Sequence, residues 1–258
     1  MGLKTSCSAF SRVMSIAMSR LAFEKCFIYL DDLITFGRSL ATHNQNLIDV
    51  FERLRKVNLK LNPAKCQFLK KKILYLGHVV SADDIAPNPE KTKVLDKFPV
   101  PQNADEVRHF VAFCNYYRKF VPSFATITMT LNNLLKRDVP FIWNSDCQNA
   151  FNFLKNALIS PPILEYPDFG ESNEFILQTD ASDLAVGAVL CNKNRKPIAY
   201  ASRPLNKAEK NYPVIEKELT AILWAVKYFR TYLFGRAFTI MTDHKPLVYL
   251  FGMKDPSN

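Results

Sequence analysis

The sequence lacks several features that define secreted or membrane proteins. Its six cysteines are scattered singly and none follows a Cys-x-x-Cys spacing, which argues against a disulfide framework or a cysteine zinc site. The opening MGLKTSCSAF has no apolar stretch of signal-peptide length. No uncharged apolar run is long enough for a membrane span. These absences predict an intracellular protein with reduced thiols, cytoplasmic or nuclear, that does not enter a membrane.

Acidic residues are in deficit. The chain has 34 Lys and Arg against 24 Asp and Glu, which gives a net charge of +10 and a pI near 9.3. Such an excess suits a polyanionic partner such as nucleic acid, although many basic proteins bind none, so charge alone leaves the question open. With 258 residues, of which 48% are hydrophobic, the chain can form one large domain or two ordinary ones.

The first two thirds of the chain predict helices between short strands. Apolar residues at helical spacing indicate helices over 10–25 and 43–57, and two short strands flank an Asp-Asp pair between them. A strand interrupted by Gly77 is expected over 73–80, and the proline-containing stretch 81–101 predicts turns with a short helix. Further helices are expected behind a capping box led by Asn103, over 131–136 and over 145–158.

The last hundred residues predict a mixed sheet. Strands are expected over 175–179, 186–190 and 197–202, then a helix from Val214 to about Arg230, then a strand over 237–242. The fourth strand can return beside the first through a right-handed crossover, which makes the two parallel neighbours.

Asp31 and Asp32 form the most informative dipeptide. Adjacent acids between apolar strands repel each other unless solvent or a cation lies against them, and Mg²⁺ prefers such oxygen ligands. A polar hairpin turn is the simpler alternative, and Asp-Asp alone favours it. The flanking residues change this balance, because Tyr29-Leu30-Asp31-Asp32 within FIYLDDLITF resembles the Tyr-x-Asp-Asp signature of reverse transcriptases.

Neighbouring stretches extend the resemblance in the same order along the chain. The region around Tyr75-Leu-Gly-His-Val-Val-Ser81 is similar to the primer-grip hairpin of the Pol polyprotein of gypsy-type LTR retrotransposons. Other matching stretches are 51–66 in the palm and Pro89–Lys91, Cys114–Phe120 and Leu134–Lys136 in the thumb and the segment after it.

A second acidic set comprises Asp180, Glu218 and Asp243. If the first and fourth strands are parallel neighbours, both aspartates emerge at one edge of the sheet and the helix points Glu218 toward them. Three converging acids destabilise a fold unless cations bind, so this arrangement implies metal. Taken singly, each acid is more simply explained as solvated.

The residues around these acids favour the metal site. Gln178–Ser182, Pro197–Arg203, Glu216–Leu219 and Thr242–Pro246 resemble the RNase H domain of retroelements. The resemblance implies that Asp180, Glu218 and Asp243 bind metal and that the domain hydrolyses the RNA strand of an RNA–DNA hybrid. Glu216 is expected to be solvated, since it points elsewhere on the helix.

The resemblance as a whole implies an α/β (α+β) chain of three modules. These are a partial reverse-transcriptase palm (1–86), a helical thumb and connection (87–165) and an RNase H-like domain (166–258). The implied function is RNA-directed DNA polymerase with ribonuclease H, dependent on Mg²⁺ or Mn²⁺. The implied partners are an RNA template, a DNA primer, their hybrid and dNTPs, with no prediction of oligomeric state. The implied catalytic and metal-binding residues are Asp31, Asp32, Asp180, Glu218 and Asp243, and the implied nucleic-acid contacts are Tyr29, Gly77, His78, Arg118 and Lys119.

Basic residues fit the same interpretation, although solvated helix faces explain any single one equally well. Phe113, Tyr116 and Tyr117 share a helix with an apolar stripe, which favours core positions over base stacking. The palm lysines in question are Lys56, Lys60, Lys65, Lys70, Lys71 and Lys72.

The sequence departs from the family pattern in several places. The stretch 2–11 resembles a template- and nucleotide-contacting segment, but Thr5, Ser6, Cys7 and Ser11 replace its usual Asn, Ala, Pro and Gln. Asp84 replaces a turn glycine, which is costly if the position needs a positive φ. The chain is also expected to be truncated at both ends, so that each active site lacks one carboxylate. It is then a segment of an active polyprotein, a fragment with weak nuclease activity only, or an inactive remnant that at most binds nucleic acid.

Overall fold

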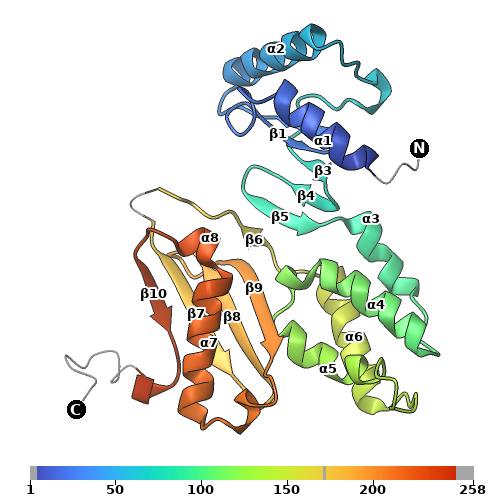
Figure 1. Ribbon diagram of the computed structural model, residues 1–258, viewed down its shortest axis with the longest axis vertical. Helices are drawn as coiled ribbons and strands as arrows, with labels where there is room; N and C mark the ends of the chain where they lie inside the picture. Colours follow the sequence, from blue (N-terminus) through green and yellow to red (C-terminus); the bar gives the residue numbers. More distant parts are fainter. Residues whose placement is uncertain (1–4, 171–172, 248–258) are drawn as a thin grey trace. The chain divides into compact units, whose positions relative to one another are not determined.

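A computed structural model describes residues 5–170 and 173–247 (Figure 1). Its contacts divide the chain into two compact units, with the boundary between Leu69 and Lys70. Residues 2–4 of the segment compared with the nucleotide-contacting stretch, and the RNase H-like region after Leu247, lie outside the described residues. Among the described residues, no helix is both long enough and apolar enough to cross a membrane.

The first unit packs two helices against a hairpin. Its elements are α1 (Ser6–Ala17), β1 (Cys26–Tyr29), β2 (Asp32–Thr35), α2 (Leu40–Lys56) and the 3₁₀ turn η1 (Pro63–Lys65). The expected helix over 10–25 is wrong at both ends, because the chain leaves α1 at Met18 and a series of turns carries Leu21 into the core. Within the predicted range, the apolar side chains of Phe10 and Val13 are exposed, whereas Met14 and Ala17 are buried.

The second unit begins with a four-stranded antiparallel sheet. Its strands are β3 (Ile73–Tyr75), β4 (His78–Val80), β5 (Asp84–Pro87) and β6 (Leu164–Glu165), in that spatial order. The interruption at Gly77 is a hairpin turn, but β5 was expected to be a turn region and β6 was not expected. Asp84 adopts no positive φ, so its replacement of glycine carries no backbone cost.

Helices follow this sheet in the chain. They are α3 (Pro89–Thr92), the 3₁₀ turn η2 (Lys93–Lys97), α4 (Ala104–Tyr116), the 3₁₀ turn η3 (Arg118–Phe120), α5 (Phe124–Asn133) and α6 (Ser145–Ile159). The predicted cap at Asn103 is confirmed, because Asn103 Oδ1 accepts a hydrogen bond from the Glu106 N–H at 2.9 Å. The Glu106 carboxylate returns to Asn103 Nδ2 and to the Gln102 N–H, each at 2.8 Å, so the second half of the capping box is shifted by one residue. The helix expected over 131–136 is misplaced, because α5 begins at Phe124 and ends at Asn133.

The mixed sheet is confirmed (Figure 1). Its strands are β7 (Phe175–Ala181), β8 (Ala185–Cys191), β9 (Pro197–Pro204) and β10 (Phe238–Met241), in the order β10-β7-β8-β9. β10 is parallel to β7, as predicted, and the other pairs are antiparallel. The 3₁₀ turn η4 (Glu209–Asn211) precedes α7 (Val214–Tyr228), and α8 (Arg230–Leu233) follows it.

The helix α7 packs on β7 and β8 through small side chains. Ala221, Ile222, Ala225 and Phe229 are buried, and the alanines let the helix approach the sheet closely. Leu223, although apolar, lies on the opposite side of the helix and is 55% exposed. The α+β architecture places α7 against β7, and β10 lies parallel to β7 on the other side from β8; this arrangement forms the candidate site.

Candidate metal centre and hairpin sites

Asp31 and Asp32, the candidate acids of the first unit, lie on the β1–β2 hairpin. Tyr29 pairs with Asp32 across the ladder, so Leu30 and Asp31 form the turn. Leu30 has a φ of 54°, a left-handed conformation that is unusual for a branched side chain and marks local strain. Asp31, Asp32 and Tyr29 are exposed. The hairpin therefore presents two neighbouring carboxylates to solvent, as the sequence predicted.

These two acids differ from the second set in one respect. Asp180, Glu218 and Asp243 form a group of three potential metal ligands, the one such group within residues 5–170 and 173–247. Asp31 and Asp32 are joined by no third acidic, His or Cys side chain in the part of the chain that the structure describes. The hairpin alone is thus a less complete metal site than the mixed sheet.

The β3–β4 hairpin is held at its turn by an unusual number of hydrogen bonds. Leu76 and Gly77 form the turn with φ values of 45° and 71°. The Leu76 carbonyl accepts hydrogen bonds from Tyr116 Oη at 2.5 Å and pairs with His78 Nδ1 at 2.7 Å. The Gly77 carbonyl accepts from Tyr117 Oη at 3.0 Å and from the Asn88 N–H at 3.0 Å.

Gly77 is required by this packing. A Cβ atom at this position would lie 3.1 Å from the ring and hydroxyl of Tyr116 and 3.4 Å from the hydroxyl of Tyr117. Because φ is also positive, glycine satisfies both the backbone and the space. The two tyrosines come from the end of α4, about forty residues along the chain, so the turn and this helix are held together.

His78 is enclosed by aromatic rings. Its ring centroid lies 5.6 Å from those of Tyr116 and Tyr117 and 5.7 Å from that of Phe120. Burial lowers the pKa of His78, and the positive charge of Lys119 lowers it further. Since Nδ1 donates to a carbonyl, Nε2 carries the lone pair, and this buried atom has no hydrogen-bond partner within residues 5–170 and 173–247.

An open apolar cavity of about 370 Å³ adjoins this cluster. Its wall includes Tyr75, His78 and Tyr116, and Lys119 supplies the charge among its lining residues. Burial lowers the pKa of Lys119, whose ammonium lies 5.1 Å from the Phe120 ring centroid. Arg118, the other basic residue expected to contact nucleic acid here, is exposed on η3.

The second acidic set converges at one edge of the mixed sheet. Asp180 is the next-to-last residue of β7, and Asp243 follows the end of the parallel strand β10 by two residues. Glu218 reaches the same place from α7. One ligand oxygen from each acid lies within 4.8 Å of the others. The sequence prediction that these three acids meet is therefore matched by their positions in the structure.

The three carboxylates have different surroundings. Asp180 and Asp243 are exposed, whereas Glu218 is only 4% exposed. Glu218 Oε2 is buried, and no described residue forms a hydrogen bond with it. Burial raises the pKa of Glu218, and the carboxylate of Asp243 raises it further. Hydrogen bonding to the Ala181 N–H opposes this shift in the pKa.

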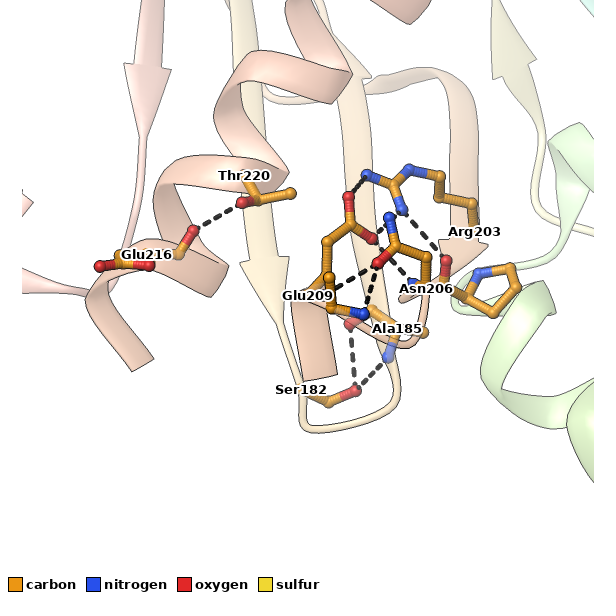
Figure 2. Close-up of polar contacts among 9 residues, drawn as sticks. Ser182, Ala185, Arg203, Asn206, Glu209, Glu216 and Thr220 are labelled. Carbon is orange, nitrogen blue, oxygen red and sulfur yellow. Dashed lines mark hydrogen bonds and ion pairs between the residues drawn. The ribbon is translucent and has the colours of Figure 1, made fainter. Parts of the chain in front are cut away.

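This arrangement fits a divalent cation of the Mg²⁺ type. Carboxylate oxygens are the hard ligands that Mg²⁺ and Mn²⁺ prefer. A buried carboxylate oxygen without a partner, next to two further acids, is costly unless a positive charge compensates it. Glu216 is exposed, as predicted, and its backbone carbonyl accepts a hydrogen bond from Thr220 Oγ1 at 2.7 Å (Figure 2).

Sequence reasoning missed some residues around these sites. Tyr116, expected in the core, is 54% exposed and contributes its hydroxyl to the β3–β4 turn. Asn88 and Arg203 were not singled out, although the Asn88 N–H donates to the Gly77 carbonyl and the Arg203 side chain donates to Glu209 shortly before α7. The Tyr-Tyr pair was the available signal for the contact with this turn, because a buried tyrosine such as Tyr117 needs a partner for its hydroxyl.

Two family models match the chain. Residues 1–80 match the reverse transcriptase (RNA-dependent DNA polymerase) family, and residues 143–240 match the RNase H-like domain found in reverse transcriptase.

Curated relatives match along nearly the whole chain. The Pol polyproteins of Drosophila melanogaster transposons 412 and 297 are 46% and 44% identical over 100% and 99% of the chain. The Tf2-3 transposon polyprotein of Schizosaccharomyces pombe is 35% identical over 96%. The chain spans only 21%, 24% and 19% of the length of these three polyproteins.

Solved structures of a foamy viral protease–reverse transcriptase share the fold. The complex with double-stranded DNA gives a TM-score of 0.83 at 21% identity and covers 100% of this chain and 54% of that one. The complex with an RNA/DNA hybrid gives 0.80 at 21% identity and covers 94% and 33%. From its Tyr-x-Asp-Asp hairpin to its mixed sheet, the chain belongs to the reverse transcriptase and RNase H-like family found in retrotransposon Pol polyproteins.

Proposed function

We propose that the chain supplies the RNA-directed DNA polymerase and ribonuclease H functions of a retrotransposon Pol polyprotein, and that its own most complete centre is the nuclease. The observation that carries this proposal is the convergence of Asp180, Glu218 and Asp243, with one oxygen of Glu218 buried and unpartnered. Mg²⁺ or Mn²⁺ is the cofactor that this donor set suits.

The three acids have separate roles in this proposal. Bound divalent metal would activate a water molecule and stabilise the leaving oxygen of a phosphodiester. Glu218 would hold the metal from the buried side of the site, where a bound cation would offset the burial and the neighbouring carboxylates that raise its pKa. Asp180 and Asp243 face solvent at the sheet edge, where a nucleic-acid phosphate has access.

The proposed substrate of the nuclease is the RNA strand of an RNA–DNA hybrid. The foamy viral structure with an RNA/DNA hybrid supports this class of ligand, because it shares the fold of this chain. The net charge of +10 supports a polyanionic partner. Recognition would rest on backbone shape and 2′-hydroxyls rather than on base sequence.

In the polymerase function, Asp31 is proposed as a metal ligand and Asp32 as its supporting acid, acting on an RNA template, a DNA primer and dNTPs. We expect no primer extension by this chain alone, because two exposed carboxylates without a third ligand provide a weak metal site. Incorporation of labelled dNTPs that disappears in Asp31→Asn would contradict this expectation.

Cleavage of a labelled RNA–DNA hybrid tests the proposed nuclease. We expect RNA-strand cleavage that requires Mg²⁺ or Mn²⁺ and is lost in Asp180→Asn, with Glu216→Gln as the control that retains it. Cleavage that persists in Asp180→Asn would show that the acidic cluster is not the active site. Hybrid binding that weakens with salt but produces no cleavage would identify the alternative, an inactive remnant that only binds nucleic acid.

A further inference from the structure

The position of Glu218 depends on where α7 begins. Oxygen ligands of a metal must be placed to within about 0.2 Å, so a small shift of this helix would separate Glu218 from the two aspartates. The helix α7 follows Pro213, and its N-terminus has no side-chain cap. No side-chain cap therefore fixes where the helix begins. Packing on β7 and β8 holds the body of α7, and the preceding loop from Leu205 to Pro213 restrains its first turn.

Arg203, near the end of β9, connects this strand to the loop through an ion pair with Glu209 (Figure 2). Its Nη1 and Nη2 donate hydrogen bonds to Glu209 Oε2 and Oε1 at 2.7 and 2.9 Å. A two-point contact of this kind fixes the orientation as well as the distance of both groups. The side chains of Arg203 and Glu209 are 29% and 13% exposed, so solvent screens the pair only in part.

Asn206 completes the structure of the loop. Its backbone N–H donates to Glu209 Oε2 at 2.9 Å, and its own Oδ1 accepts from the N–H groups of Ala208 and Glu209, each at 2.9 Å. Arg203 Nη1 also donates to the Pro204 carbonyl at 3.1 Å. The Glu209 carboxylate thus accepts three hydrogen bonds and closes the loop in one conformation (Figure 2).

Arg203 also lies against α7 itself. Its guanidinium carbon is 5.8 Å from the ring centroid of Trp224, a distance at which a cation attracts an aromatic face. Trp224 follows Glu218 by fewer than two helical turns. One side chain therefore contacts both the loop before the helix and the helix that carries the acid.

An ion pair connects α7 to the turn after β7, the strand that bears Asp180. Lys217 Nζ donates to Asp183 Oδ1 at 2.7 Å, and Asp183 lies in the turn after β7. The Lys217 side chain is 10% exposed, but that of Asp183 is 87% exposed. An exposed partner weakens an ion pair, so this tie restrains the helix less than the pair of Arg203 and Glu209 does.

We propose that Arg203, acting through Glu209, is a positioning residue that sets Glu218 in the acidic cluster. This inference rests on the proposed metal site. Arg203 touches neither metal nor substrate in this role. It fixes the loop that restrains the first turn of α7, and α7 in turn determines where the Glu218 carboxylate lies.

Mn²⁺ titration of the full chain tests the proposal, with the dissociation constant read by electron paramagnetic resonance. Glu209→Gln and Arg203→Lys are compared with wild type, and Asp180→Asn gives the level without the site. Glu216→Gln is the matched control, because it makes the same chemical change at an exposed position of α7. All variants are measured at a temperature at which circular dichroism shows them fully folded.

We expect Glu209→Gln to weaken Mn²⁺ binding about tenfold, the lower end of the range for residues that orient metal ligands. Arg203→Lys should act similarly, since lysine keeps the charge but not the two-point contact. The double variant should bind no more weakly than the weaker single variant, because the two residues act as one pair. Glu216→Gln should bind as wild type does.

The outcomes separate this inference from the function on which it rests. Wild-type affinity in folded Glu209→Gln and Arg203→Lys would overturn the positioning role and leave the metal site standing, even if both variants melt at lower temperature. Absence of Asp180-dependent Mn²⁺ binding in wild type would overturn the metal site, and the positioning role with it.

Discussion

Gly77 and Gly235 have nearly the same left-handed backbone, with φ values of 71° and 73°, but different surroundings. A Cβ atom at Gly77 would press against Tyr116, whereas one at Gly235 would have no atom within 4 Å among the described residues. Comparing the same substitution at the two glycines therefore separates the free-energy cost of the left-handed backbone from that of the steric contact with Tyr116. Both positions lie in the second unit, which makes the comparison direct.

We predict that Gly77→Ala destabilises the chain more than Gly235→Ala. The left-handed conformation costs a non-glycine residue about 1–2 kcal/mol at either position. At Gly77 the tyrosines must also move, which adds about 1–3 kcal/mol as in other overpacked sites. Urea unfolding of the two variants measures the difference. Equal losses of unfolding free energy would show that the tyrosines do not hold the turn.

Glu218 also occupies a position that costs the fold free energy, here because of its charge rather than because of a steric contact. Its buried oxygen has no partner within the described residues, and two carboxylates lie beside it. A residue placed at such a cost is characteristic of a functional site, because an isolated fold would gain stability from a neutral side chain there.

At the scale of elements, the β3–β4 hairpin joins a histidine to the end of α4. Burial lowers the pKa of His78, and Lys119 and Lys91 contribute positive charge that lowers it further. The contact of Nδ1 with the Leu76 carbonyl opposes this change in the pKa. Folding therefore disfavours the protonated ring, which makes the stability of the hairpin depend on pH.

We predict that acid destabilises wild type more than His78→Asn. The unfolded chain takes up a proton on His78 near its ordinary pKa of 6.5, while the folded chain does so only at lower pH. The stability linked to His78 is thus complete above pH 6.5 and is lost as the pH falls toward the folded pKa. The slope for one proton is at most about 1.4 kcal/mol per pH unit.

Urea midpoints measured from pH 8 to pH 5 test this prediction. Asparagine retains an N–H donor for the Leu76 carbonyl but does not titrate, so other ionisable groups contribute equally to both curves. Parallel curves for wild type and His78→Asn would contradict the buried, neutral histidine.

Elements with strong periodicity were predictable from the sequence. The strands β7 to β10 and the helix α7 have clear apolar patterns, and the parallel pairing of β10 with β7 follows from crossover handedness. The meeting of Asp180, Glu218 and Asp243 could be predicted for the same reason, because strand ends and helix spacing determine it.

Elements fixed by tertiary contacts were not predictable. The first two turns of α5 were not predicted because they contain a run of β-branched residues, which have low helix propensity. In the structure, packing against α6 overrides that preference. β5 ends in a proline, and β6 has two residues and pairs only with a distant strand. The loop held by Arg203 has no periodic signal, because hydrogen bonds between polar side chains and backbone form it.

At the scale of the whole molecule, buried residues form cores that belong to one unit or the other. The core of the first unit contains Ala17, Met18, Leu21, Cys26, Val50 and Leu54. In the second unit, one core lies among α4, α5 and α6, and another lies between α7 and the mixed sheet. Chains with separate cores commonly depart from two-state unfolding.

We predict that matched core truncations in the two units have separate effects. Leu54 is 5% exposed and Leu177 is 0% exposed, and replacing a buried leucine by alanine costs about 2–5 kcal/mol. Leu54→Ala should raise amide hydrogen exchange within residues 5–69 and leave Mn²⁺ binding unchanged. Leu177→Ala lies on β7, three residues before Asp180, and should raise exchange in the mixed sheet and weaken Mn²⁺ binding. Exchange that rises equally in both units for either variant would show one cooperative structure, because each truncation would then destabilise the whole chain.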